Sequence, residues 1–191
     1  MKVFVINLPK RTDRLDVFTK QAQEQGFEFE IQYGEIFKHD RKKGITRAHQ
    51  ACVRKAKEEG LPMVAIFEDD TLFIGGPTAW EYFLSKIPGS FHLYFTMLYV
   101  TSLDENNKVN SVSSGMTGYI IHESFYDVFL SIPESSHIDR ASTAMFNDYN
   151  FYVCDKFVAM QSGSFSDNSL TTCDYTPLLK GRKLYGQDNT L

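Results

Sequence analysis

Three consecutive acids, Glu68-Asp69-Asp70, follow directly after the apolar run Met63–Phe67. Their mutual repulsion destabilises a fold unless a positive group lies among them. Because side chains alternate along extended backbone, Glu68 and Asp70 are expected to share one side while Asp69 points away. Two hard oxygen donors on one side suit a Mg²⁺ or Mn²⁺ ion that also binds phosphates. A solvated strand end or a helix cap is the alternative interpretation.

Cations are concentrated before the first predicted helix, in the segment Leu8–Arg14, which contains Lys10, Arg11 and Arg14. A helix N-terminus favours anions, and a guanidinium fork matches phosphate oxygens. The sequence has no Gly-x-Gly-x-x-Gly and no Gly-Lys-Ser/Thr element, so a dinucleotide fingerprint or a P-loop is a poor interpretation. A solvated, charged first turn is the alternative for this segment.

A second predicted helix opens near Gly44–His49, with Arg47 and His49 close to its first turn. Anions are favoured at that end of a helix, so we predict Arg47 as a further contact to a phosphate-bearing ligand. His49 is a candidate for proton transfer, although a lone histidine is more often structural.

The elements around these segments alternate through the first half of the chain. Hydrophobic periodicity and helix boundaries predict helices over residues 12–25, 46–59 and 79–87, the second capped by Thr46. Strands are predicted over residues 2–8, 27–33, 63–67 and 91–101. Further along, the sequence predicts strands at 109–122 and 152–160 and a helix at 124–132.

This order of elements predicts an α/β fold with a single, Rossmann-like, mostly parallel sheet flanked by helices. Such sheets bind ligands beyond the carboxyl ends of their strands. The cations of Leu8–Arg14 and the acids of Glu68–Asp70 each follow a predicted strand. We therefore expect both groups at the same edge of the sheet.

The chain's 191 residues and net charge of -4 fit one soluble domain and argue against a large nucleic-acid face, although a local basic groove is compatible with them. No apolar run approaches the ~20 residues that span a bilayer, and the N-terminus lacks a signal-peptide pattern. The three cysteines have no metal-type spacing, which favours a reducing compartment. We predict a cytoplasmic protein. The cations of its basic stretch Lys38–Lys43 and of its tail either lie in solvated loops or contact anionic acceptors or the inner membrane face.

Taken in order, the motifs resemble glycosyltransferase family 25, which includes lipooligosaccharide and collagen galactosyltransferases. The resemblance covers roughly residues 2–168. It rests on Ile6-Asn7-Leu8, Arg11, Arg14, Gly44-Ile45, Ala48-His49, Phe67-Glu68-Asp69-Asp70, Gly115–Ile121, His137-Ile138-Asp139, Val158–Gln161 and Ser166-Asp167.

The resemblance implies a GT-A-like domain over residues 1–170, followed by a polar C-terminal tail over 171–191. It also implies a UDP-sugar donor, Mn²⁺ (or Mg²⁺) dependence and an inverting mechanism, with galactose or glucose as the expected hexose. Glu68 and Asp70 would hold the metal, and Asp139 would be the base unless it caps a helix before Arg140. The predicted catalytic residues are Asp139 and His49. Asp167 is expected to line the site or to order the last loop. The predicted donor-binding residues are Asn7, Leu8, Arg11, Arg14, Arg47, Glu68, Asp69 and Gln161.

Two other functions compete with hexose transfer. A nucleotidyltransferase also uses acids and a metal on a related fold, but its Gly-rich loop after the first strand is missing from Leu8–Arg14. A non-catalytic nucleotide-sugar-binding module would keep the fold without the reaction. The acceptor is expected to be a glycan, such as a lipid-linked or lipopolysaccharide glycan, with a protein hydroxylysine or a hydroxylated base as alternatives.

Overall fold

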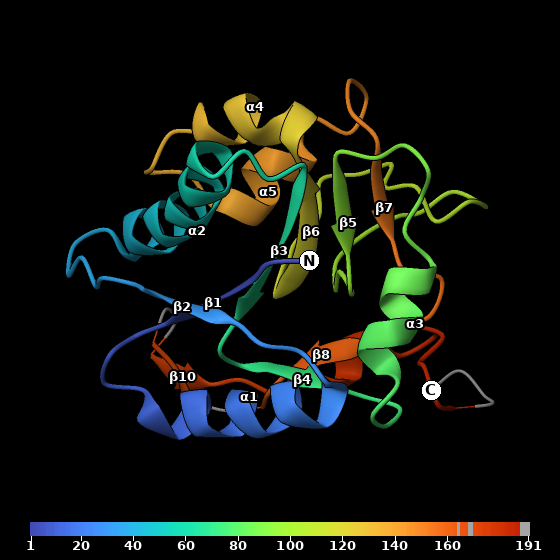
Figure 1. Ribbon diagram of the computed structural model, residues 1–191, viewed down its shortest axis with the longest axis horizontal. Coiled ribbons are helices and arrows are strands. Elements are labelled where there is room, and N and C mark those ends of the chain that lie inside the picture. Colours follow the sequence, from blue (N-terminus) through green and yellow to red (C-terminus); the bar gives the residue numbers. More distant parts are fainter. Residues whose placement is uncertain (164, 168–169, 188–191) are drawn as a thin grey trace.

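A six-stranded sheet forms the centre of the protein (Figure 1). The computed structural model describes residues 1–163, 165–167 and 170–187. The strands of the sheet are β1 (Val3–Asn7), β2 (Glu30–Tyr33), β3 (Met63–Glu68), β5 (Leu93–Phe95), β6 (Gly118–His122) and β7 (Phe151–Val153). They lie in the order β2-β1-β3-β6-β5-β7, and β6 is antiparallel to both neighbours whereas the other pairs are parallel. The predicted α/β fold with a mostly parallel sheet is confirmed.

Helices cover both faces of this sheet. They are α1 (Thr12–Gln25), α2 (Arg41–Glu58), α3 (Ala79–Ser85), α4 (Tyr126–Leu130) and α5 (Ile138–Thr143), with the short 3-10 helices η1 (Glu123–Phe125) and η2 (Thr176–Leu179). Figure 1 shows α2 and α4 on one side of the sheet and α1 on the other. Within the described ranges, every helix is too short or too polar to cross a lipid bilayer.

The two-sided cover follows from the composition of the strands. Successive side chains of a strand point to opposite faces, so a strand that is apolar at every position buries both faces. In β1, Phe4 packs into the core that also contains residues of α2 and α4. Val3 and Val5 pack into the other core, beside residues of α1 and α3. The carboxyl ends of β1 and β3 are thereby fixed next to each other, with Ile6 paired to Glu68.

Helix α2 begins at Arg41 rather than at Thr46, which corrects the predicted boundary. Asp40 caps it, because its Oδ1 accepts a hydrogen bond from the Lys43 amide at 3.3 Å. Thr46 is fully buried within the helix, where its hydroxyl donates to the Ser136 carbonyl at 2.9 Å. The last residues of the basic stretch Lys38–Lys43 are therefore helical and not part of a loop.

Several predicted strands are shorter than the apolar runs that suggested them. The run at 152–160 divides into β7 and β8 (Ala159–Gln161), because the chain leaves the central sheet after Val153. Strand β8 then pairs antiparallel with β4 (Thr71–Phe73) in a separate two-stranded sheet. In the run at 27–33, Phe27 and Phe29 pack their rings against Phe18 and only the following residues pair as β2.

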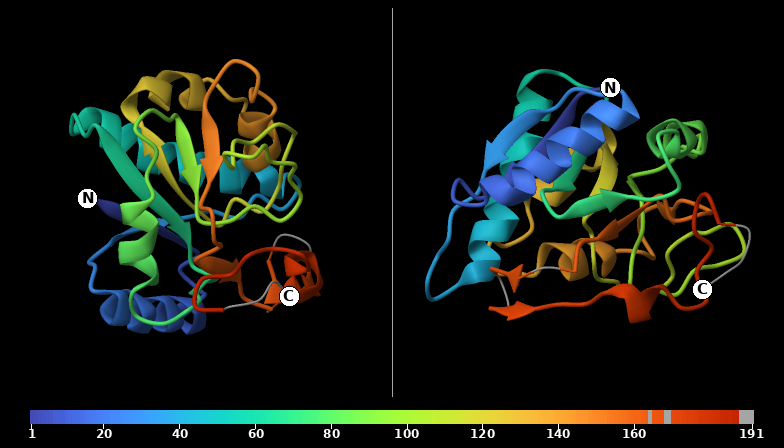
Figure 2. Two further views of the ribbon diagram at one scale, coloured as in Figure 1. Left: turned by 90° about the vertical axis from the view of Figure 1, so that its right-hand side faces the viewer. Right: turned by 90° about the horizontal axis from the view of Figure 1, so that it is seen from below.

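The described part of the predicted polar tail packs against the rest of the protein. Leu179 and Leu184 are buried in the main core, which is the one that contains Phe4. The Phe157 amide donates to the Lys183 carbonyl at 2.8 Å, and the Tyr185 amide donates to the Phe157 carbonyl at 2.9 Å. Both views of Figure 2 show this segment (red) lying against the body of the molecule. Residues 188–191 of the predicted tail lie outside the described residues.

Gly118 provides a test of this packing. A Cβ at Gly118 would lie 2.6 Å from two ring carbons of Phe67 and 2.9 Å from the Thr96 hydroxyl. Overpacking of a filled core costs about 1–3 kcal/mol, so we expect Gly118→Ala to lower the free energy of unfolding by that amount in urea denaturation. Gly89→Ala is the matched control. Its Cβ would meet nothing within 4 Å, so this variant should keep or slightly raise the free energy of unfolding. Equal stability of the two variants would contradict the tight packing.

Candidate functional site

The acidic triplet Glu68-Asp69-Asp70 lies where β3 ends and the chain turns into β4. Glu68 is the last residue of β3, and Asp69 and Asp70 form the turn. The pairing of β4 with β8 places Gln161 beside this turn. The Gln161 Nε2 atom donates to Asp70 Oδ2 at 3.0 Å, and the Ser162 amide donates to the Asp70 carbonyl at 2.7 Å.

Arg14, from the first turns of α1, binds two of these acids. Its Nη1 atom lies 3.1 Å from Asp69 Oδ1 and 3.0 Å from Asp70 Oδ2. The expectation that Asp69 points away is wrong, because the backbone turns after Glu68 and no longer alternates as a strand does. The other Asp69 oxygen accepts a hydrogen bond from Asn7 Nδ2 at 2.7 Å.

The triplet holds more negative charge than Arg14 balances. Burial, followed by the charges of neighbouring acids, raises the pKa of Glu68 to about 8 and that of Asp70 to about 6. The pKa of Asp69 is also raised, chiefly by burial and then by Asp70. The Glu68 side chain keeps 28% of its surface exposed, so solvent tempers its shift. Such a cluster favours an added cation, because the cation would stabilise the ionised carboxylates.

His49 stands behind Glu68. Its Nδ1 atom lies 3.0 Å from the Tyr119 hydroxyl and its Nε2 atom 3.3 Å from Glu68 Oε1. Burial lowers the pKa of His49 to about 4, so the imidazole is neutral at physiological pH. With 1% of its side chain exposed, His49 is suited to orienting Glu68 rather than to meeting a substrate itself.

Asp139 reaches the site from the first turn of α5. Its Oδ2 atom accepts from the Gly115 amide at 3.1 Å and its Oδ1 atom from the Arg140 amide at 2.8 Å. His137 occupies the N-cap position of α5, so the alternative role of Asp139 as a helix cap is wrong. Two backbone donors therefore fix the direction of this carboxylate.

These side chains line one cavity of about 370 Å³, a volume within the range of small-ligand pockets. It is formed by the ends of β1 and β3, the starts of α2 and α5, and the C-terminal segment. The predicted site residues that line it are Leu8, Arg14, His49, Glu68, Asp69, Asp70, Asp139 and Gln161, together with Asp167.

The structure places the remaining predicted residues outside the cavity wall. Asn7 is buried behind the triplet, where it donates to Asp69 and to the Arg11 carbonyl. Arg11 forms ion pairs with Asp13 at 2.8 Å and with Asp167 at 2.7 Å.

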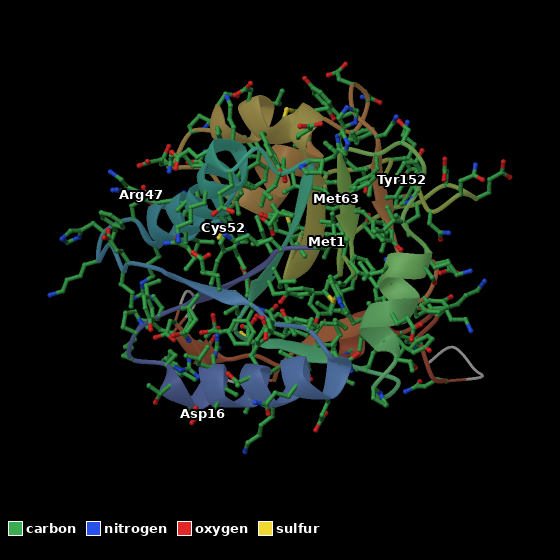
Figure 3. All side chains as sticks on the ribbon, viewed as in Figure 1. Met1, Asp16, Arg47, Cys52, Met63 and Tyr152 are labelled. Carbon is green, nitrogen blue, oxygen red and sulfur yellow. The ribbon has the colours of Figure 1, made fainter. Side chains whose placement is uncertain are left out.

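Arg47 is not brought together with the other predicted donor contacts. It lies in the second turn of α2, since that helix begins at Arg41, and it lines a different cavity beside β2. Its Nε atom is 3.8 Å from Glu134, and Figure 3 shows the residue at the edge of the molecule.

Three residues of the site were missed by sequence reasoning. The Thr117 hydroxyl donates to Asp70 Oδ1 at 3.4 Å, and the Tyr99 hydroxyl accepts from the Gln161 amide at 2.7 Å. Arg41 lines the cavity and donates to the Asp167 carbonyl at 3.0 Å. Arg41 carried a signal as part of the basic stretch Lys38–Lys43, and Thr117 as part of the Gly115–Ile121 motif. Tyr99 carried none, because its contact joins segments far apart in the chain.

The carboxylates fit a divalent cation only in part. Within the described ranges, no group of three or more His, Cys, Asp or Glu side chains is arranged to hold a metal ion. Glu68 and Asp70 supply hard oxygen atoms, so a Mg²⁺ or Mn²⁺ ion at this edge would need phosphate oxygens to complete its shell. The donor chemistry therefore fits a metal that binds together with a phosphate-bearing ligand.

Neither a protein-family model nor a curated protein sequence matches the chain. Among solved structures, it is similar to a glycosyltransferase involved in the glycosylation of the major capsid of PBCV-1, with a TM-score of 0.50, 11% identity and 80% of each chain covered. It is also similar to the inositol-1-phosphate CTP transferase from T. maritima, with a TM-score of 0.50, 13% identity, and 93% of this chain and 74% of that chain covered. At these identities the likeness shows a shared fold.

The raised pKa of Glu68 predicts how stability depends on pH. The pKa of about 8 in the folded protein lies above the usual 4.5 of a glutamate carboxyl, so stability falls as pH rises between these two values. Glu68→Gln removes this charge, and after allowance for partial exposure we expect it to be about 2 kcal/mol more stable than wild type at pH 9 in EDTA. The difference should shrink toward zero at pH 5.

Thermal and urea unfolding at both pH values measure this difference. Glu58→Gln, at an exposed position of α2, is the control and should match wild type at both. A Glu68→Gln protein that is less stable than wild type at pH 9 would mean that the contact with His49 outweighs the cost of burying the carboxylate.

Proposed function

We propose that this protein is a glycosyltransferase that moves a hexose, galactose or glucose, from a UDP-sugar to a hydroxyl group of a glycan or other acceptor, with inversion at the anomeric carbon. The observation that carries the proposal is the convergence of Arg14, the acidic triplet and Asp139 on one cavity at the carboxyl ends of β1 and β3. The ordered motifs resembling glycosyltransferase family 25 support it. The fold shared with a capsid-glycosylating enzyme is compatible with it.

The donor would lie with its diphosphate near Arg14 and the acidic triplet. Leu8 and Ile6 give that end of the cavity an apolar wall for the nucleoside. Arg14 is oriented by the Asp69 and Asp70 carboxylates and by the Phe165 carbonyl, to which its Nη2 atom donates at 2.9 Å. A Mn²⁺ or Mg²⁺ ion bound by Asp70 and Glu68 would neutralise charge on the diphosphate as it leaves.

Asp139 is the proposed general base. The acceptor oxygen forms a bond to the anomeric carbon while the bond from that carbon to the diphosphate oxygen breaks, and the diphosphate keeps the electron pair. The acceptor proton passes to the Asp139 carboxylate. The amides of Gly115 and Arg140 hold that carboxylate in place, which is the orientation a general base requires.

A nucleotidyltransferase is the second candidate, because the fold is also shared with a CTP transferase. That reaction would release pyrophosphate from a nucleoside triphosphate. The segment after β1, Leu8–Arg14, contains Pro9 and no glycine, so it lacks the flexible loop that would wrap a triphosphate.

Product analysis separates these functions. Purified protein is incubated with Mn²⁺ and either a UDP-sugar (UDP-galactose or UDP-glucose) plus a glycoside acceptor, or the nucleoside triphosphates plus a hexose 1-phosphate. The release of UDP and of pyrophosphate is measured. We expect UDP release from a UDP-sugar and its loss in EDTA. Pyrophosphate release without UDP release would favour the second candidate, and binding without either product would favour a non-catalytic module.

Two variants should separate donor binding from transfer. We expect Asp70→Asn to lose Mn²⁺-dependent binding of UDP, measured by calorimetry, because it removes a proposed metal ligand. Asp139→Asn should lower the transfer rate by about 10²–10⁴-fold, the range for loss of a general base. Asp148→Asn, at an exposed position, is the control for both measurements. Transfer that survives in Asp139→Asn would assign the base to another residue.

A further inference from the structure

An apolar shelf forms part of the cavity wall. It consists of Tyr175, Leu178 and Val100, all of which line the cavity. Val100 is 57% exposed and Leu178 is 44% exposed, so both offer apolar surface to a ligand in the cavity. Two of the shelf residues come from the C-terminal segment, whose composition suggested a polar tail.

Contacts on two sides hold the shelf in place. The ring of Tyr175 stacks on that of Tyr99, with centroids 5.1 Å apart and an angle of 13° between the planes. Arg182 Nη2 donates to the Tyr99 carbonyl at 3.4 Å and to the Thr101 carbonyl at 3.1 Å, which joins the C-terminal segment to the segment after β5. Leu179, next to Leu178, is buried in the main core. A surface fixed from both sides binds a ligand without a large ordering cost.

The shelf is also linked to the proposed base. A Cβ at Gly115 would lie 2.5 Å from the Tyr99 ring, so this glycine and the ring are in close contact. Its φ of 88° is one that glycine adopts readily. The Gly115 amide donates to Asp139 at 3.1 Å. Tyr175, Tyr99, Gly115 and Asp139 therefore form one continuous run of contacts.

We propose that Tyr175 is a specificity-determining residue that binds the acceptor, with Leu178 and Val100 completing its subsite. The occupant is a pyranose ring whose apolar C–H face packs against the tyrosine ring, so that one of its hydroxyl groups meets Asp139. Aromatic rings give such a ligand a large apolar contact, while nearby polar groups select its orientation. This inference rests on the proposed function and names the acceptor side of that site.

Acceptor kinetics and ligand-observed NMR test the subsite. Transfer from UDP-galactose or UDP-glucose is measured with methyl β-galactoside, methyl β-glucoside, lactose and a hydroxylysine peptide as acceptors. Saturation-transfer NMR on the same glycosides, with UDP and Mn²⁺ present, reports binding independently of turnover. We expect Tyr175→Ala to raise the KM for the glycoside acceptor about tenfold, with the KM for the donor changed less than twofold.

Three further variants serve as controls for Tyr175→Ala. Tyr175→Phe keeps the ring and should behave as wild type, and Leu178→Ala should raise the acceptor KM by a smaller factor than Tyr175→Ala. Tyr33→Ala, at a tyrosine that is 54% exposed and lines the other cavity, should change neither KM. Melting temperatures of all variants show whether any loss reflects unfolding.

Each outcome decides the inference. An unchanged acceptor KM in Tyr175→Ala, or a wild-type protein that uses only the peptide, overturns the shelf as a sugar subsite and leaves the proposed function standing. Wild-type protein that releases no UDP and shows no glycoside signal in NMR overturns both. A glycoside signal that Tyr175→Ala abolishes supports the shelf even where turnover is too slow to measure.

Discussion

The guanidinium of Arg14 lies between the carboxylates of Asp69 and Asp70, and the whole site depends on this contact. All three side chains are largely buried, with 13% of Arg14 and 8% of each acid exposed. Buried charges are tolerated only when they are paired and hydrogen-bonded. Arg14 also donates to the Phe165 carbonyl, so one side chain joins α1, the turn after β3 and β9 (Phe165–Ser166).

The positive charge of Arg14 does not balance all the carboxylates of the site. Glu68 has a neutral histidine as its neighbour, and the negative charge of Asp139 acts on both residues. A core selected for stability alone would not gather these acids at the end of one strand. Such conflicts between stability and local chemistry are expected where a protein binds a charged ligand, because the ligand supplies what the apo fold lacks.

The features that sequence reasoning located well are those with local signals. The strand before Glu68 is a short apolar run, and Arg14 follows the first strand within a few residues, so both fall at the expected edge. The direction of Asp69 could not be predicted, because the turn that redirects it is set by the pairing of β4 with β8. Arg47 was misplaced through a helix boundary, and Tyr175 was not singled out because the segment around it was taken for a polar tail. The position of β8 and the stacking of Tyr175 on Tyr99 both depend on contacts between segments far apart in the chain. A single sequence has no local signal for such contacts.

The reversed direction of β6 has an evolutionary consequence. Strand β5 ends, and β6 begins, at the edge of the sheet where the acidic triplet lies, so the chain from 96 to 117 leaves and re-enters the sheet at that edge. This segment carries Val100 and Gly115 in its interior, and its last residue, Thr117, donates to Asp70. Insertions or deletions between 101 and 113 would reshape the cavity wall at Val100 and Gly115 and leave the contacts of Tyr99 and Thr117 in place. Under the proposed function, related proteins that differ in this loop would differ in the acceptor that they modify and share the donor.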